Sequence, residues 1–144
     1  MRALLDVNVL IALFDADHTQ HERAHIWFAV NQSQGWASCP LTENGLVRIL
    51  SHPHYSRVIQ RTPAQVVADL CMVCSQTDHE FWPDNLTLRD SHIIQADRIK
   101  GPRQITDIYL LALAVSHGGR MVTFDDGIPV DVVVGMRPEH FVLL

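Results

Sequence analysis

The sequence is poor in lysine and cysteine and has no long apolar run. Lys100 is the only lysine among eleven basic residues, and sixteen acidic residues give the 144-residue chain a formal net charge of −5. A negative chain does not attract nucleic acid through its bulk charge, so any contact with RNA or DNA has to depend on local arginines or on metal ions. The three cysteines, an odd number, do not make a disulfide framework.

The apolar segment that opens the chain, Ala3 to Phe14, is interrupted by Asp6 and Asn8 and has only Arg2 as a basic flank. It lacks a small-residue cleavage site, so we expect neither a signal peptide nor a membrane span, and we expect a protein of the cytoplasm. The sequence contains no internal repeat and no low-complexity segment. Its length and its 47% hydrophobic residues predict a single globular domain over residues 1–144.

Two groups of metal-binding residue types have an ordinary structural interpretation. Cys71 and Cys74 resemble a redox or zinc pair, but they lie in a helical apolar pattern without a second pair, which favours cysteines of the core. His18, His21 and His25 are spaced to lie near one another, and a metal site there is the alternative to a solvated histidine face. Because no acidic or thiol residue completes the histidine set, we favour the solvated face.

Short apolar runs typical of buried strands alternate with helical patterns along the chain. This alternation predicts an α/β fold with a central parallel sheet. We expect strands at 2–6, 36–39, 80–82 and 121–124, with one or two short edge strands at 132–134 and 141–143. We expect helices at 9–14, 19–30, 41–50, 62–74, 88–98 and 107–115.

The helix predicted at 107–115 carries a charge on its apolar face. Thr106 is a good N-cap residue, and the i, i+3, i+4 spacing places Asp107 on one face with Leu110 and Leu111. An ionised carboxylate in such a place is costly unless it is paired, hydrogen-bonded or bound to a metal. The plain alternative is an acid that complements the helix dipole, which stabilises it by about 0.3–1 kcal/mol.

Three further acidic residues repeat this anomaly. Glu43 continues the apolar stripe of the helix predicted at 41–50, and Asp6 and Asp125 each end a buried strand. In a right-handed βαβ arrangement, the carboxyl ends of strands and the N-termini of the following helices lie at the same edge of the sheet. We therefore expect Asp6, Glu43, Asp107 and Asp125 to converge.

Carboxylates gathered within about 4–6 Å repel one another by a few kcal/mol per pair, so they share protons or hold cations. Because all the donors are oxygens, the set favours Mg²⁺ or Mn²⁺ over zinc, and such ions typically meet phosphate oxygens. Setting the four aside leaves eleven basic and twelve acidic residues. The acidity of the chain is therefore largely the acidity of the predicted site.

The order of these motifs resembles that of the PIN-domain ribonucleases, and more narrowly that of VapC-type toxins of bacterial toxin–antitoxin pairs. The resemblance is carried by residues 5–11 (LDVNVLI), the pair Thr42-Glu43, residues 105–114 (ITDIYLLALA) and Thr123-Phe124-Asp125. It runs through the whole chain and includes Gly118-Gly119. Each motif is weak alone, but the four together in register are specific.

The resemblance implies a central parallel sheet of about five strands flanked by helices, and an endoribonuclease dependent on Mg²⁺ or Mn²⁺. It assigns the acidic cluster to Asp6, Glu43, Asp107 and Asp125, as catalytic residues and metal ligands. Asn8 and Thr123 match polar positions that organise the cluster. Asp126 is a further ligand position, with a turn residue before Gly127 as the favoured alternative. The family also implies a homodimer and a cognate antitoxin whose C-terminal segment occupies the active-site groove.

The mechanism that follows from this resemblance is in-line attack on an RNA phosphodiester by a metal-activated water, without a side-chain nucleophile. Arg48 and Arg103 are our candidates for contact with the RNA backbone, because each is near a cluster residue in sequence, and a solvated surface charge is the alternative for both. The acidity and the single lysine favour a narrow, structured RNA target over indiscriminate cleavage.

Two other functions stay open. A non-catalytic protein-binding module would keep the fold and lose no activity when an acid or the metal is removed. A phospho-acceptor signalling domain also places acids around Mg²⁺ at strand ends, but it requires a lysine at a later strand end. Lys100 stands in a Lys-Gly-Pro turn instead.

Overall fold

The computed structural model describes all residues, 1–144, and its centre is a five-stranded sheet in which every strand is parallel to its neighbours. The strand order is β3-β2-β1-β4-β5, with bounds β1 (Ala3–Leu5), β2 (Trp36–Ser38), β3 (His79–Phe81), β4 (Arg120–Thr123) and β5 (Phe141–Leu143). The helices are α1 (Val7–Phe14), α2 (His21–Asn31), α3 (Pro40–Leu50), α4 (Pro63–Gln76) and α5 (Ile105–Ser116). The predicted α/β fold with a parallel sheet is confirmed.

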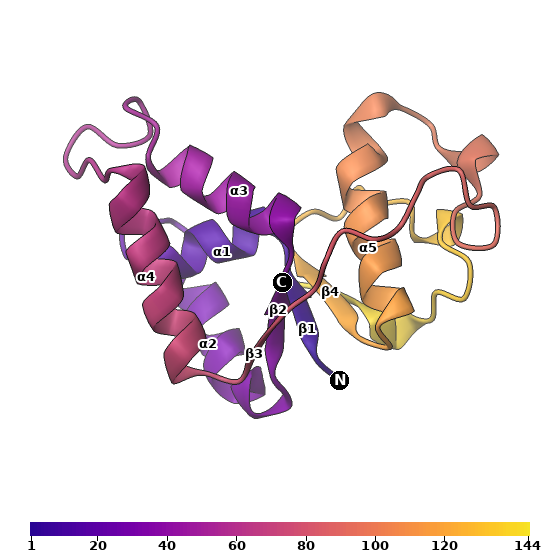
Figure 1. The fold of residues 1–144 in the computed structure, drawn as a ribbon, viewed down its shortest axis with the longest axis horizontal. Helices are drawn as coiled ribbons and strands as arrows, with labels where there is room; N and C mark the ends of the chain where they lie inside the picture. Colours follow the sequence, from indigo (N-terminus) through magenta and orange to yellow (C-terminus); the bar gives the residue numbers. More distant parts are fainter.

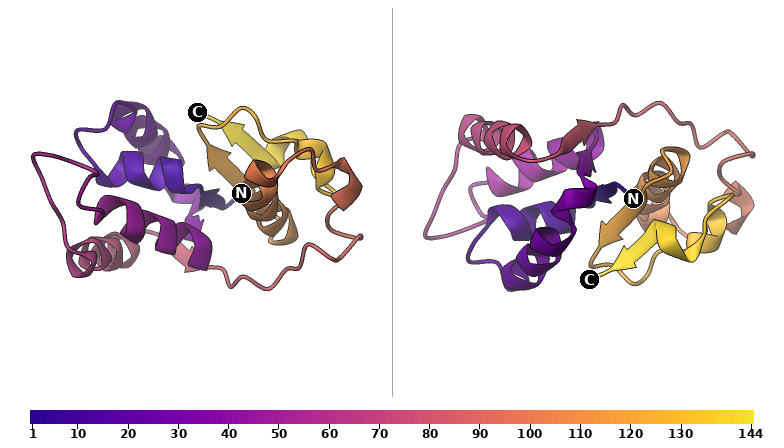
Figure 2. Two further views of the ribbon diagram at one scale, coloured as in Figure 1. Left: turned by 90° about the horizontal axis from the view of Figure 1, so that it is seen from above. Right: turned by 90° about the horizontal axis from the view of Figure 1, so that it is seen from below.

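The sheet separates two groups of helices. Helices α1 to α4 lie on one side of it, and α5 lies on the other side with the long segment that follows β3 (Figures 1 and 2). The two faces follow from strand geometry, because successive side chains of a strand point to opposite faces. Leu4 and Met121 pack in the core that includes Leu111 of α5, whereas Leu5 and Val122 pack in the core that includes α1 and α3.

The first turn of α4 has the hydrogen bonds expected at the start of a helix. Thr62 Oγ1 accepts a hydrogen bond from the backbone N–H of Gln65 at 3.2 Å, and Gln65 Oε1 accepts one from the N–H of Thr62 at 2.8 Å. Pro63 occupies the first helical position, where its missing N–H costs nothing. None of the helices combines the length and apolarity that a membrane span requires.

The prediction of a helix at 88–98 is wrong, and of the one or two edge strands predicted at 132–134 and 141–143, one forms. Residues 88–98 form a series of turns that ends in the 3₁₀ turn Ala96–Arg98. Residues 132–134 form no strand, and Val132 is the last residue of the 3₁₀ turn Val130–Val132. Buried Ile94 makes a single antiparallel bridge with Val133, which holds both segments against the core without a helix or a strand. The edge strand that forms is β5, Phe141–Leu143.

Helix α5 begins two residues earlier than the sequence predicts. The 3₁₀ turn Pro102–Gln104 runs directly into it, and Gln104 precedes the helix in a helical backbone conformation without a side-chain cap. Thr106 is therefore inside the first turn and does not cap it. Asp107 becomes the third helical residue and still lies near the N-terminus.

The cysteines form no pair. All three are free, and Cys71 and Cys74 lie on α4, as expected from the helical pattern. Cys71 is exposed, so the prediction of a core cysteine is wrong there, because its position on α4 faces solvent. Cys74 is half-buried, and burial raises the pKa of its thiol to about 11. A reactive thiolate at Cys74 is therefore disfavoured.

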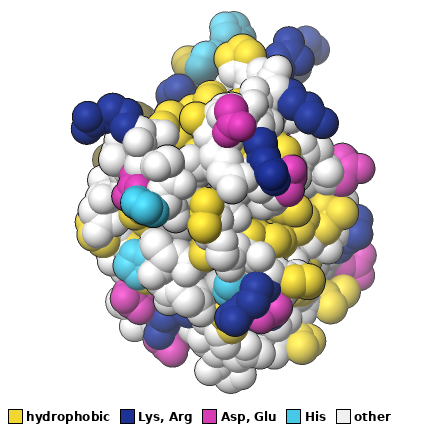
Figure 3. Space-filling model, turned by 90° about the vertical axis from the view of Figure 1, so that its right-hand side faces the viewer, with side chains coloured by type: hydrophobic (Ala, Val, Ile, Leu, Met, Phe, Trp, Pro, Cys, Tyr) yellow, Lys and Arg dark blue, Asp and Glu magenta, His cyan; other side chains and the backbone are white.

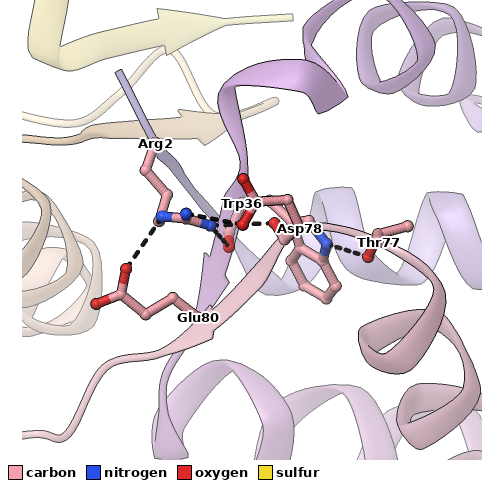
Figure 4. A network of polar contacts seen from close by, with 5 residues as sticks. All are labelled: Arg2, Trp36, Thr77, Asp78 and Glu80. Carbon is pink, nitrogen blue, oxygen red and sulfur yellow. Dashed lines mark hydrogen bonds and ion pairs between the residues drawn. The ribbon is translucent and has the colours of Figure 1, made fainter.

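The side chain of Arg2 joins the ends of three strands (Figure 4). Its Nη1 donates to the carbonyl oxygens of Trp36 at 3.1 Å and Asp78 at 3.0 Å, and the guanidinium forms ion pairs with Asp78 at 2.8 Å and Glu80 at 3.1 Å. Gly35 makes room for this arrangement, because its φ is +75° and a Cβ at this position would collide with the guanidinium. Arg2 thus holds β3, the edge strand, to the sheet.

We expect Arg2→Ala to lower the free energy of unfolding by about 1–2 kcal/mol, because two carbonyl acceptors and two carboxylates lose a shared donor. Arg98→Ala is the matched control, since the exposed Arg98 pairs with Asp131 at 3.6 Å and donates weakly to its carbonyl oxygen at 3.5 Å, and it should change stability by less than about 0.5 kcal/mol. Urea denaturation of both variants measures the difference. Equal losses would contradict the role of Arg2.

Candidate active site

The candidate site begins where β1 ends. Asp6 directly follows β1 and caps α1, with its Oδ1 accepting from the backbone N–H of Val7 at 2.7 Å. Its Oδ2 accepts from the hydroxyl of Thr123, the last residue of β4, at 2.6 Å. Asp6 is 5% exposed. Both carboxylate oxygens are therefore held by groups from two neighbouring strand ends.

The hydroxyl of Thr123 has three partners. Besides donating to Asp6, it accepts from Asn8 Nδ2 at 3.1 Å and from the backbone N–H of Asp125 at 3.1 Å. Asn8 Oδ1 in turn accepts from the N–H of Phe124 at 3.3 Å. Asn8 and Thr123 thus lie in one network that ties the start of α1 to the turn after β4.

Asp125 lies in this turn and is exposed. Its Oδ1 accepts from the backbone N–H of Gly127 at 2.8 Å, which fixes the turn. Asp126 is also exposed and has no recorded side-chain hydrogen bond. The turn directs one of its two aspartates, Asp125, into the network of Thr123.

Asp107 reaches the same region from α5. Burial, together with the charges of Asp6 and Asp125, raises its pKa to about 6. Burial also raises the pKa of Asp6, against the lowering effect of the hydrogen bond from Thr123, and the charge of Asp125 adds to the increase. The structure therefore brings Asp6, Asp107 and Asp125 within electrostatic reach of one another.

Glu43 is not part of this group. Its carboxylate oxygen Oε1 accepts from the hydroxyl of Ser38 at 2.6 Å. Ser38 shares a sheet face with Leu5 and Val122, the face of α1 to α4, whereas Asp6 and Thr123 continue the opposite face. The expected convergence of four carboxylates is therefore incomplete, because α3 and α5 cover opposite faces of the sheet (Figure 1).

Sequence reasoning did not single out two residues next to Glu43. Ser38 is fully buried at the end of β2, and its hydroxyl lies 2.8 Å from Nε2 of His79, the first residue of β3. Burial lowers the pKa of His79, so its ring is neutral at pH 7. Ser38 could have been found from the sequence, because it is a polar residue at the end of a predicted buried strand. The sequence held no comparable signal for His79.

The three aspartates fit a hard divalent cation. They supply only carboxylate oxygens, the donors that Mg²⁺ and Mn²⁺ prefer, and a bound cation would offset the repulsion among them. The structure contains no group of three or more acidic, histidine or cysteine side chains placed to hold a metal ion. Because Mg²⁺ is usually bound through one or two carboxylates and keeps several waters, an ion here would need water and phosphate oxygens to complete its coordination.

The remaining predicted residues are two arginines and the histidines near α2. Arg48 on α3 and Arg103, just before α5, are both exposed and form no ion pair. The histidines serve local structure: His21 Nδ1 donates to the carbonyl of Ala12 at 2.7 Å, and His18 Nδ1 accepts from the N–H of Gln20 at 3.1 Å. This arrangement agrees with a structural role for the histidine face.

A mostly apolar cavity lies elsewhere in the molecule. It measures about 340 Å³ and is lined mainly by apolar side chains of α1, α2 and α4, with Trp36 of β2. None of the four predicted acids lines it. Its chemistry does not suit a metal or a phosphate, so the aspartate cluster is the better candidate for the active site.

Comparison with known proteins relates the whole chain to one group of nucleases. The model of the PIN domain family matches residues 3–130. Ribonuclease VapC44 of Mycobacterium tuberculosis is 46% identical over 144 residues, which covers all of both chains. Ribonuclease VapC39 of the same organism is 43% identical over 136 residues, 94% of this chain and 97% of the relative.

Two solved structures share the fold at 14% identity. VapC20 of Mycobacterium tuberculosis, described as a Sarcin-Ricin loop cleaving toxin, superposes with a TM-score of 0.61 over 94% of this chain and 99% of its own. VapBC2 of Rickettsia felis, solved with a DNA fragment from its promoter, gives a TM-score of 0.58 over 100% and 98%. At this identity the likeness concerns the fold alone.

We expect Asp107→Asn to raise the free energy of unfolding in metal-free buffer at pH 7.5 by about 1 kcal/mol. A pKa raised from 3.8 to about 6 corresponds to nearly 3 kcal/mol, which we discount because Asp107 is half-exposed. Since the folded-state pKa is raised, the ionised form destabilises the fold. The gain is therefore complete above about pH 6 and vanishes as the pH falls to about 4.

Thermal unfolding of Asp107→Asn across this pH range tests the expectation. Asp97→Asn, a change at an exposed acid outside the cluster, is the control and should show no such gain. A loss of stability in Asp107→Asn at pH 7.5 would contradict the assigned repulsion.

Proposed function

The chain belongs to the PIN-domain family, and from this premise we propose that it is a divalent-metal-dependent endoribonuclease, the toxin of a type II toxin–antitoxin pair. The observation that carries the proposal is the group of Asp6, Asp107 and Asp125 at the carboxyl edge of the sheet: the Thr123 hydroxyl bonds to the Asp6 carboxylate and the Asp125 backbone, and the charges of both aspartates act on Asp107. Two curated relatives with this length and more than 40% identity are named ribonucleases. Residues 1–144 act as one PIN domain.

Asp6, Asp107 and Asp125 hold the cation in this proposal. Thr123 and Asn8 position these groups: the Thr123 hydroxyl fixes one oxygen of Asp6 and the backbone of Asp125, and Asn8 fixes the hydroxyl. A bound Mg²⁺ or Mn²⁺ supplies a water of lowered pKa as nucleophile and stabilises negative charge on the phosphate. The exposed position of Asp125 leaves this edge open to a phosphodiester.

The substrate is RNA, contacted through its backbone by exposed arginines beside the site. Arg48 lies in the longest acid-free part of the chain, residues 44–68, which contains three arginines and no Asp or Glu. The side of the molecule that carries α5 instead shows basic and acidic side chains intermixed (Figure 3). Arg48, in the last turn of α3, and Arg103, just before α5, are the proposed contacts with the RNA backbone.

A cognate antitoxin is the proposed protein partner, with its C-terminal segment in the active-site groove, and the protein is a homodimer that acts in the cytoplasm. The name of the solved VapBC2 complex shows that a protein of this fold is found with its partner. A structured RNA is the proposed target, since net charge alone does not retain RNA on this chain. The protein named for cleavage of the sarcin-ricin loop gives one example of such a target in a relative.

We expect the purified chain to cleave total bacterial RNA at a few defined sites with Mg²⁺ or Mn²⁺, and not with chelator. Asp6→Asn and Asp107→Asn should each slow cleavage at least about 100-fold, because each removes a carboxylate from the cation site. Asp97→Asn should cleave normally. Cleavage that survives in both aspartate variants would refute the proposed site.

The same aspartate variants should still bind the antitoxin, which co-purification after joint expression measures. A folded wild-type chain that binds the antitoxin and cleaves no RNA in any metal condition would support a non-catalytic binding module instead.

We expect Arg48→Glu to raise KM for RNA about 3- to 10-fold with little change in kcat, because a backbone contact is lost and the acids are untouched. The slope of the logarithm of the RNA-binding constant against the logarithm of the salt concentration should become shallower by about one unit. Arg137→Glu is the control, since Arg137 already pairs with Glu139 at 2.9 Å. An equal rise in KM for the control would show a nonspecific effect of charge.

A further inference from the structure

The hydroxyl of Ser38 stands between Glu43 and His79. It lies 2.6 Å from Glu43 Oε1 and 2.8 Å from His79 Nε2. Because a carboxylate only accepts hydrogen bonds, the single hydroxyl proton is donated to Glu43, and His79 has to donate from Nε2 to the serine oxygen. The order of donation is therefore fixed: from His79 to Ser38, and from Ser38 to Glu43.

The ring of His79 is held in place by its surroundings. His79 and Trp36 are directly paired on parallel strands, and their rings lie 4.4 Å apart at 53°. The indole Nε1 of Trp36 donates to Thr77 Oγ1 at 2.8 Å, and Thr77 Oγ1 donates to the carbonyl of Val73 at 2.7 Å (Figure 4). His79 is the first donor in this relay, by which we mean the hydrogen bonds from His79 to Ser38 and from Ser38 to Glu43. Its ring thus has little freedom to turn away from Ser38.

The first turn of α3, which carries Glu43, is equally fixed. Thr42 Oγ1 accepts from the N–H of Cys39 at 3.0 Å and donates to its carbonyl at 3.1 Å. Gly45 lies directly against Val7 at the start of α1, where a Cβ would come within 2.7 Å of the valine side chain. The start of α3 is therefore adjacent to the helix that Asp6 caps, while the Glu43 side chain points to Ser38.

We propose that His79 and Ser38 are positioning residues that hold the Glu43 carboxylate apart from Asp6, Asp107 and Asp125 until a divalent cation binds. The inference rests on the proposed function and concerns the same site. Without a cation, the three aspartates would repel the Glu43 carboxylate, and the hydrogen bond from Ser38 stabilises Glu43 away from them. With a cation bound, the cation attracts the Glu43 carboxylate, which then leaves Ser38 and joins the aspartates.

This exchange makes a quantitative prediction through linkage. The hydrogen bond from Ser38 stabilises only the cation-free arrangement, so it competes with cation binding. Its removal should tighten the apparent Kd for the cation by about 10- to 150-fold, the factor that corresponds to one hydrogen bond to a charged group. A merely structural role for Ser38 predicts no change or weaker binding.

Calorimetric titration of the intact protein with Mn²⁺ tests the proposal. Ser38→Ala and His79→Leu should bind Mn²⁺ more tightly than the wild type, the first by the larger factor. His79→Gln should stay near the wild type, because its amide can donate the same hydrogen bond. In a Glu43→Gln background, which should bind Mn²⁺ more weakly, Ser38→Ala should have no further effect. Unchanged or weaker binding by Ser38→Ala and His79→Leu would overturn the relay.

A second measurement needs neither a variant nor a metal. Long-range proton–nitrogen NMR spectra of the cation-free wild type should show neutral His79 protonated at Nε2, and protonation at Nδ1 would overturn the relay. RNA cleavage, measured in parallel, separates the two proposals. Tighter Mn²⁺ binding by Ser38→Ala in a protein that cleaves no RNA supports the relay and overturns only the proposed function. Absence of Mn²⁺ binding by the wild type overturns both.

Discussion

The site depends on one buried hydrogen bond, from the hydroxyl of Thr123 to the carboxylate of Asp6. A charged group that is 5% exposed destabilises a fold unless its oxygens have partners, and this bond supplies one of two. The same hydroxyl accepts from Asn8 and from the backbone of Asp125. The start of α1, the end of β4 and the turn that follows are therefore positioned together.

The sheet gives the acids different environments. Asp6 and Asp107 are reached from the face that α5 covers, where burial and neighbouring carboxylate charges raise their pKa values. Glu43 belongs to the face of α1 to α4, where it accepts a hydrogen bond from Ser38, whose hydroxyl also contacts His79. A parallel sheet brings strand ends to one edge, but the alternation of side chains decides which face of that edge each residue serves.

The alternation of apolar strands and helices predicts the parallel sheet, because these patterns depend on local spacing. The same local reasoning finds the acids, since a carboxylate on an apolar stripe is visible in the sequence itself. It misses the segment 88–98, where one long-range contact between Ile94 and Val133 replaces a helix. It also misses Ser38 and His79, whose meeting depends on the register between β2 and β3. Contacts set by register cannot be predicted from spacing along the chain.

The pairing of β1 with β4 also determines when the protein acquires its site during synthesis. Asp6 and Thr123 are separated by 117 positions, which a ribosome takes roughly 6–25 s to translate. Until β4 has been translated and has left the ribosome, β1 has no β4 to pair with, and Asp6 has no Thr123 hydroxyl to accept from. The candidate site therefore assembles later in synthesis than helices α1 to α4, which all precede β4 in the chain.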